Sequence, residues 1–164
     1  MPLAIKPAKM KISIRRAVPE DAANISDLCF RSKQSNGYDQ AFMEACRDEL
    51  TYCEGDLINM CFWVAEANRI LGCAALGAGQ GARNSEVRSF FIDPACQRQG
   101  VGKKLWQVML AEAKNRSYTR LHLDADPFAV PFYLALGFSV YDQSPSGSIP
   151  GRMLPKMELL LPVK

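Results

Sequence analysis

Apolar side chains recur along the chain first at every second position and then at helical spacing, and this change of period predicts the first elements. Residues 11–15 alternate apolar and polar side chains, which indicates a strand. The tripeptide Pro-Glu-Asp at residues 19–21 then opens a helix, because proline suits the first turn and acidic side chains favour its positive end. Apolar residues at helical spacing continue this helix to Cys29, and a second helical segment is expected from about Gln40 to Leu50.

The rest of the chain alternates shorter strands with two further helices. Strands are expected at residues 60–66, 70–76, 86–92, 121–124, 139–141 and 156–161, and helices at residues 101–115 and 128–136. This order predicts a mixed α/β fold with one central sheet of about six to seven strands, flanked by about four helices. No linker rich in Gly, Ser or Pro divides the chain, so we expect a flexible segment at residues 1–10 and a single domain over residues 11–164.

Composition narrows the class of protein. The 164 residues, 48% of them hydrophobic, suffice for one well-packed core. The formal net charge of +3 is too small to indicate nucleic-acid binding. No run of about eighteen apolar residues predicts a membrane span, and the N-terminal residues lack the continuous apolar stretch of a secretory signal. We therefore expect a cytoplasmic protein that binds neither nucleic acid nor membranes.

The cysteines fit the same compartment. The chain has six, with no Cys-x-x-Cys pair, and an even number permits a disulfide framework. Four of the six fall in apolar or helical segments, which favours buried, reduced thiols. The single histidine, His122, has no cysteine near it in the sequence, so we expect no metal site.

One segment between a strand and a helix has the composition of an anion site. The strand at residues 86–92 is followed by Pro94, a short polar loop and two glycines that open a long helix. The first N–H groups of such a helix have no acceptor within it, and the aligned peptide dipoles leave positive charge there. Gly100 and Gly102 would let a diphosphate approach the backbone closely. Basic residues surround the loop: Arg98, Lys103 and Lys104.

Two common phosphate-binding motifs do not fit this loop. A Walker A loop would need Gly at position 97 and Ser or Thr at position 104, where Gln97 and Lys104 stand. A dinucleotide-binding fingerprint starting at Gly100 would need a third glycine at position 105, which is Leu105. The remaining pattern is Gln-x-x-Gly-x-Gly. By itself it is also compatible with an ordinary helix start whose glycines serve packing.

Three segments in order make the pattern specific. They are ISIRRAVPEDAANISDL, FFIDPACQRQGVGKKL and ADPFAVPFYLALGF. In these segments the chain resembles the GNAT family of acetyl-CoA-dependent N-acyltransferases: the first strand and helix, the pyrophosphate-binding segment, and the helical tyrosine followed by Gly-Phe. The resemblance covers roughly residues 11–161. It implies acetyl-CoA as co-substrate, a primary amine as acceptor and direct transfer between the two, and it is compatible with a homodimer.

The resemblance also assigns cofactor-binding residues. The backbone amides that would bind the CoA pyrophosphate are those of Gln97, Arg98, Gln99, Gly100, Val101 and Gly102, with Lys103 adding charge. Phe91 and Ile92 would offer backbone groups to the pantetheine arm, which would lie between their strand and the one ending near Asp124. Asp126 stands where many family members carry an asparagine, which puts that side-chain contact to CoA in doubt.

Two catalytic roles follow from the resemblance. Tyr133 matches the tyrosine that protonates the departing CoA thiolate; the alternative is one more aromatic residue in a packed helix. Glu86 matches a glutamate that serves some members as general base; the alternative is a solvent-facing strand residue, and Asp124 and Asp126 are further candidates for the base. His122 is expected to be structural.

Acceptor recognition has fewer signals. Lys33 and Tyr38 lie in a polar stretch between the first two helices, a region that often walls the acceptor pocket in this family. The Ser-, Gly- and Pro-rich segment near the end would be either a lid that carries Arg152 or an ordinary connection. The alternative to an enzyme is a catalytically weak acyl-CoA sensor or interaction module on the same fold.

Overall fold

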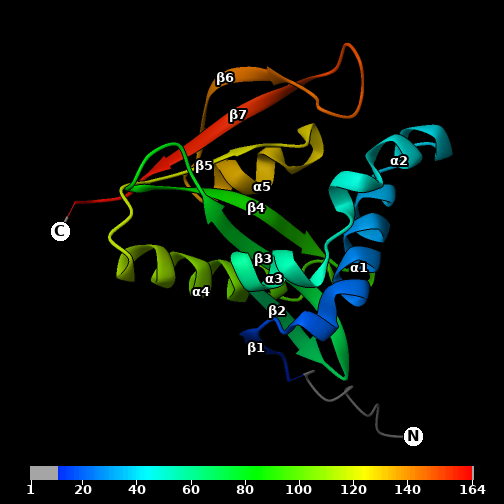
Figure 1. Ribbon diagram of the computed structural model, residues 1–164, viewed down its shortest axis with the longest axis horizontal. Coiled ribbons are helices and arrows are strands. Elements are labelled where there is room, and N and C mark those ends of the chain that lie inside the picture. Colours follow the sequence, from blue (N-terminus) through cyan, green and yellow to red (C-terminus); the bar gives the residue numbers. More distant parts are fainter. Residues whose placement is uncertain (1–10, 164) are drawn as a thin grey trace, which may run out of the picture.

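The computed structural model describes residues 11–163, which form a seven-stranded sheet with helices on both faces (Figure 1). The strands are β1 (Ser13–Arg16), β2 (Cys61–Ala67), β3 (Arg69–Ala78), β4 (Asn84–Ile92), β5 (Arg120–Asp124), β6 (Ser139–Pro145) and β7 (Met153–Leu160). The α-helices are α1 (Ala22–Gln34), α2 (Gln40–Cys46), α3 (Glu54–Asn59), α4 (Val101–Asn115) and α5 (Val130–Ala135). Short 3-10 turns are η1 (Pro19–Asp21), η2 (Asp48–Leu50), η3 (Pro94–Cys96) and η4 (Pro127–Ala129). The mixed α/β fold predicted from the sequence is confirmed.

The two faces of the sheet bury separate hydrophobic cores. Helices α4 and α5 cover one face, where Leu105 and Met109 of α4 are fully buried. Helices α1, α2 and α3 cover the other face, where Ile25 and Leu28 of α1 are fully buried. The inner strands β2 and β3 are apolar on both sides because each contributes alternate residues to both cores.

Several boundaries differ from the sequence-based expectation. The second helix ends at Cys46 and gives way to η2, and the short helix α3 was not expected. The last predicted helix is split into η4 and α5. The two final strands are longer than expected, so the Ser-, Gly- and Pro-rich segment is largely a β-hairpin, and residues 146–152 connect its strands. In Figure 1 this connecting loop lies on the same side of the molecule as α1 and α2.

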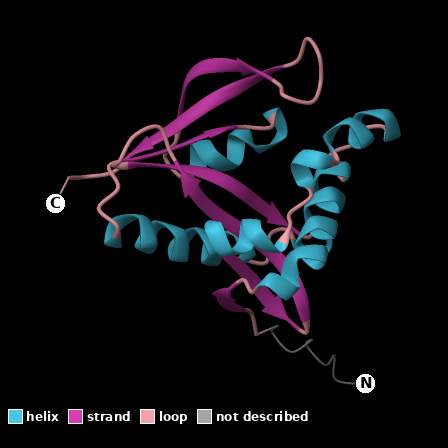
Figure 2. Ribbon diagram, in the orientation of Figure 1, coloured by secondary structure: helices cyan, strands magenta, loops and turns pink. Residues whose placement is uncertain are grey.

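The strand order β1-β2-β3-β4-β5-β7-β6 contains one parallel pair, β4 and β5. Their ladder consists of three residue pairs, the last being Glu86 with His122. Beyond these pairs both strands continue without pairing to each other, and Figure 2 shows them diverging from a common end. The divergence leaves backbone groups of β4 and β5 facing a gap, and the candidate site lies there.

Three further expectations concern the chain as a whole. All six cysteines lie in the described residues and are free, and five are buried, as expected for reduced thiols. Between residues 11 and 163, no helix combines the length and the apolar character needed to cross a bilayer. The flexible segment expected at residues 1–10 lies outside the described residues.

Candidate active site

A cavity of about 1060 Å³ occupies the space where β4 and β5 diverge. Both strands line it, together with the end of α1, the loop before α4 and part of α5. It therefore draws on elements from both faces of the sheet. Its size is at the upper end for small-molecule sites.

Strand β4 contains a bulge at the edge of this cavity. Ser89 and Val87 pair with consecutive residues of β3, so Arg88 between them is the extra residue. Gly77 of β3 leaves room for it, because a Cβ there would lie 2.7 Å from Arg88 Cγ. The Tyr52 hydroxyl donates a hydrogen bond of 3.3 Å to the Arg88 carbonyl, which holds the bulged peptide from the other side.

The loop Gln97–Gly102 leads from η3 into α4 and lines one end of the cavity. Gly100, the N-cap of α4, has a φ of +82°, a left-handed conformation that favours glycine. Nothing lies within 4 Å of the position that a Cβ on Gly100 would occupy, so the backbone is open to a ligand there. Of the predicted pyrophosphate-binding residues, all except Gln99 line the cavity: Gln97, Arg98, Gly100, Val101, Gly102 and Lys103. Phe91 and Ile92 line it as well.

Tyr133 lies on α5 among aromatic side chains and is 8% exposed. It lines the cavity. Burial raises its pKa above the usual 10, and the nearby Cys73 acts in the same direction. The phenol is therefore neutral at physiological pH and able to donate its proton to a ligand atom.

Glu86 lines the same cavity from β4, at the last paired position of the β4–β5 ladder. Its carboxylate is partly exposed and lies 3.5 Å from an Arg88 guanidinium nitrogen. The paired residue, His122, is buried, does not line the cavity, and accepts a 3.3 Å hydrogen bond from the Gln80 N–H at Nε2. Glu86 is thus placed to act on a ligand, whereas the position of His122 fits the structural role expected for it.

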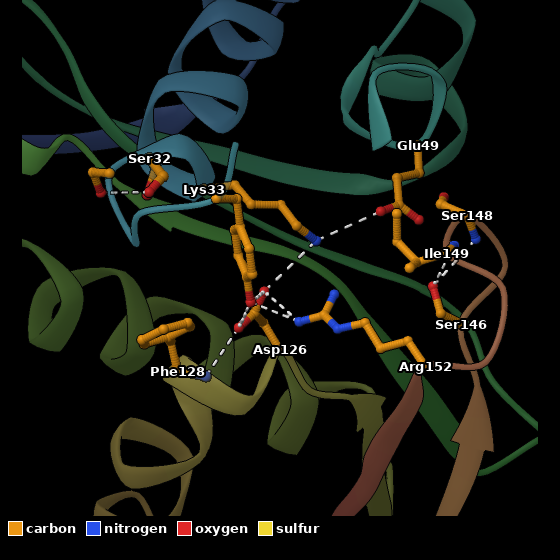
Figure 3. Close-up of polar contacts among 11 residues, drawn as sticks. Ser32, Lys33, Glu49, Asp126, Phe128, Ser146, Ser148, Ile149 and Arg152 are labelled. Carbon is orange, nitrogen blue, oxygen red and sulfur yellow. Dashed lines mark hydrogen bonds and ion pairs between the residues drawn. The ribbon is translucent and has the colours of Figure 1, made fainter. Parts of the chain in front are cut away.

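Three predicted acceptor-contacting residues converge on the carboxylate of Asp126 (Figure 3). The Tyr38 hydroxyl lies 2.9 Å from both carboxylate oxygens of Asp126. Arg152 donates to the Tyr38 oxygen at 2.6 Å and to Asp126 Oδ2 at 3.5 Å. Lys33 Nζ lies 3.7 Å from Asp126 Oδ2 and 3.5 Å from Glu49 Oε1. Asp126, which we expected at the CoA arm, is engaged with Tyr38, Arg152 and Lys33, the residues predicted to contact the acceptor.

Aromatic stacking reinforces this cluster. The Tyr38 and Phe42 rings are nearly parallel, with centroids 3.9 Å apart, and the Arg152 guanidinium lies 4.8 Å from the Phe42 centroid. Burial, together with the hydrogen bond to Asp126, raises the pKa of Tyr38 to about 12. Tyr38 is therefore a neutral hydrogen-bond donor across the physiological range.

One residue of the site, Tyr52, was missed by sequence reasoning. Besides holding the Arg88 carbonyl it lines the cavity, its N–H donates to Ser26 Oγ at 2.9 Å, and its ring packs edge-on against Phe62. It lies in the linker between η2 and α3, and no motif connects it to Arg88. Among residues 11–163, no group of three or more His, Cys, Asp or Glu side chains is arranged to hold a metal ion.

The diverging strands and the glycine-containing loop before α4 define the class of protein. The sequence matches the family described as "Acetyltransferase (GNAT) domain" over residues 29–161, and the chain belongs to this family.

Two curated proteins are similar in sequence to part of this chain. The chain is 32% identical over 66 residues to serotonin N-acetyltransferase 2, chloroplastic, of rice (Oryza sativa subsp. japonica), which covers 40% of this chain and 33% of that protein. The chain therefore spans less than half the length of the curated relatives that it matches, 33% of one and 45% of the other.

Two similar solved structures contain CoA compounds. PaiA N-acetyltransferase from Thermoplasma acidophilum, in complex with coenzyme A, has a TM-score of 0.75 at 19% identity, covering 93% of this chain and 100% of that one. YncA, a putative acetyltransferase from Salmonella typhimurium with acetyl-CoA, has a TM-score of 0.67 at 23% identity, covering 94% and 96%. At these identities the similarity establishes the fold.

Proposed function

We propose that this protein is an N-acetyltransferase that transfers the acetyl group of acetyl-CoA directly to a primary amine, with both substrates bound together. The observation that carries the proposal is the divergence of β4 and β5 after Glu86, which opens a cavity that ends at the N-terminus of α4. A thioester on a long arm fits between such strands, and a diphosphate fits at such a helix start.

The residues at the end of the cavity fit the CoA diphosphate. Gly100 leaves its backbone uncovered, and the side chains of Arg98 and Lys103 line the cavity there with positive charge. The dipole of the 15-residue helix α4 adds to this field. Phe91 and Ile92, in the part of β4 that is not paired to β5, would offer backbone groups to the pantetheine arm.

Two side chains would move protons. Glu86 would take a proton from the incoming amine, directly or through water, because its partly exposed carboxylate lines the cavity. Tyr133 would donate its proton to the departing sulfur, because its raised pKa keeps the phenol protonated and its side chain lines the cavity. A backbone N–H in the cleft would polarise the thioester carbonyl.

Titration of acetyl-CoA into the purified protein by calorimetry tests the binding half of the proposal. Lys103 lines the cavity and Lys104 does not, although both are exposed on α4. Lys103→Glu should weaken the acetyl-CoA Kd roughly tenfold, because it reverses a charge beside the diphosphate. Lys104→Glu, the matched control, should change it less than about threefold, through long-range charge alone.

Release of free thiol in the presence of amines tests the transfer half. Because the rice relative is named a serotonin N-acetyltransferase, serotonin belongs in the panel beside simple alkylamines and amino-acid amides. Thiol release that depends on one of these amines is the expected result. Binding of acetyl-CoA without thiol release from any amine would support the acyl-CoA sensor instead.

A further inference from the structure

Four side chains from distant parts of the sequence meet beside the cavity, and two of them, Lys33 and Asp126, line it. Lys33 and Tyr38 lie at the end of α1 and in the linker to α2, Asp126 is the N-cap of η4, and Arg152 is the last residue of the loop before β7. We call these four residues the roof. Tyr38 and Asp126 are 88 positions apart, and Tyr38 and Arg152 are 114 apart, yet both pairs are joined by hydrogen bonds.

The polar side chains of the roof are largely buried rather than solvated. The side chains of Lys33, Asp126 and Arg152 are 12%, 17% and 17% exposed, so water screens their ion pairs less than those at an open surface. Asp126 is also held from below, because its Oδ1 accepts the Phe128 N–H at 2.9 Å and thereby caps η4.

Apolar side chains of the same two segments pack against one core. Ile149 of the β6–β7 loop packs against the core under α1, α2 and α3, and Tyr38 and Phe42 pack against the same core. The hairpin loop and the α1–α2 segment therefore touch, and Figure 3 shows the Lys33 and Arg152 side chains both reaching Asp126.

The roof covers the face of the sheet on which an amine would enter. Tyr38 belongs to the core under α1, α2 and α3, whereas α4, whose N-terminus would hold the diphosphate, packs on the opposite face. With CoA occupying the α4 side, the acceptor has to approach from the α1 side. An extended polypeptide that presents a lysine or its N-terminus would need an open groove between the α1–α2 segment and the β6–β7 hairpin, and the roof bridges these two segments.

Building on the proposed acetyltransferase function, we propose that the acceptor is a small free amine and that Tyr38, Asp126 and Arg152 determine this specificity by excluding amines embedded in a polypeptide. A free alkylamine or arylalkylamine fits inside a cavity of about 1060 Å³. A peptide has to continue past the cavity on at least one side, and there it meets the Tyr38–Asp126–Arg152 contact.

A matched pair of probes tests the exclusion. One is n-pentylamine, and the other is acetyl-(Ala)3-Lys-(Ala)3-amide, which presents a similar alkylamine on a blocked peptide; free serotonin and lysine amide extend the small-amine set. With saturating acetyl-CoA, the wild type should use its best free amine with a kcat/KM at least about 30-fold above that of the peptide. In Arg152→Ala and Tyr38→Ala this ratio should fall at least about tenfold, because use of the peptide rises.

Controls separate the possible outcomes. Arg116→Ala removes an exposed arginine at the far end of α4, paired with Glu112, and should keep the wild-type ratio. Asp126→Asn keeps the size of the side chain and the η4 cap while removing the charge that Arg152 and Lys33 face. Asp126→Asn should shift the ratio in the same direction. It replaces the alanine variants as the test if thermal unfolding shows that they are poorly folded.

Each outcome has a distinct meaning. If no amine in the set releases thiol, the proposed function is overturned, and the acceptor inference with it. If the wild type acetylates the peptide as efficiently as the free amines, the acetyltransferase function stands and the exclusion is overturned. If the wild type rejects the peptide but the roof variants keep the same ratio, these residues do not determine specificity.

Discussion

At the scale of single residues, the site depends on a few polar groups left free among tightly packed aromatic rings. Tyr133 packs with Phe90, Phe132 and Phe138, whose ring centroids lie 5.2–6.4 Å from its own. These contacts fix the direction of the phenol. Loss of the oxygen alone therefore leaves the packing in place.

Replacing Tyr133 by phenylalanine should separate catalysis from binding. We expect kcat to fall about 10²- to 10³-fold, the usual contribution of a positioned acid, because the departing sulfur loses its proton donor. The acetyl-CoA Kd measured by calorimetry should stay within about twofold, since the ring and the α4 loop are unchanged. Tyr141→Phe, on the exposed edge strand β6, is the control and should retain wild-type turnover. Undiminished kcat in Tyr133→Phe would remove Tyr133 from the mechanism.

Asp126 shows where residue-level prediction from sequence ends. Its departure from asparagine was visible in the sequence, but its partners were not, because Tyr38 lies 88 positions before it and Arg152 lies 26 after it. Lys33, Tyr38 and Arg152 were candidates for acceptor contact on regional grounds only. That they meet one carboxylate follows from the packing of the β6–β7 hairpin against the α1–α2 segment, which no local pattern encodes.

At the scale of elements, α4 and its loop were the most predictable part of the chain. The helix was expected at residues 101–115 and is observed there, because its apolar stripe is long and its start is marked by glycines. Helix α3 was missed because it has six residues and one buried position, Leu57. The strands of the final hairpin run on to Pro145 and start again at Met153 because β7 lies between β5 and β6, although Pro145 and Pro155 favoured an irregular segment.

The position of α4 on the sheet depends on one glycine of β3. A Cβ at Gly72 would lie 2.9 Å from Val101 Cγ1, which is closer than packed carbons tolerate, and 3.0 Å from Leu105 Cδ1, which is at the limit. Gly72→Ala should therefore push the first turn of α4 off the sheet, lowering the free energy of unfolding by about 1–3 kcal/mol. The acetyl-CoA Kd should weaken several-fold in parallel, because the diphosphate loop moves with the helix.

Two further variants test this explanation of Gly72. In Gly72→Ala combined with Val101→Ala, the nearest clashing atom is gone, so urea unfolding should show part of the lost stability restored. Gly55→Ala, in α3, places a Cβ at an ordinary 3.7 Å from Cys53 Sγ and should be neutral or stabilising by up to about 1 kcal/mol. Additive losses in the double variant would contradict the packing explanation.

At the scale of the whole molecule, the short parallel ladder between β4 and β5 joins strands β1–β4 to strands β5–β7, and a hydrophobic core lies on each face of the sheet. Five polar residues of the described chain are buried: Ser85 and His122 on the β4–β5 ladder, Ser89 further along β4, Asp21 at the end of η1 and Asp93 before η3. Because Asp21, Asp93 and His122 bind protons differently in the folded and unfolded chains, they contribute to how global stability depends on pH.

Asp21 governs the acidic end of this dependence. Hydrogen bonds from Arg15 lower its pKa below the usual 3.8, against a smaller effect of burial. A carboxyl with a lowered pKa stabilises the fold above 3.8, and this stability is lost as pH falls further through the folded-state pKa. The contribution of Asp21 is therefore constant above pH 5.

His122 acts in a separate and higher range. Burial lowers its pKa below the usual 6.5, and Arg120 acts in the same direction. Its Nε2 accepts the Gln80 N–H, so the folded protein holds the neutral imidazole. Below pH 6.5 the unfolded chain binds a proton that the folded chain resists. Stability from His122 is thus complete above pH 6.5 and is lost as pH falls through the folded-state pKa.

The replacement of His122 by glutamine isolates this contribution. Glutamine can still accept the Gln80 N–H but does not titrate, so urea unfolding between pH 7.5 and pH 5 should show a loss of stability in the wild type that the variant lacks. Asp21→Asn, the control, should lose stability at every pH in this range and keep the same slope as the wild type. If His122→Gln declines in parallel with the wild type, protonation elsewhere in the chain limits stability near neutral pH, and the buried histidine at the β4–β5 junction does not.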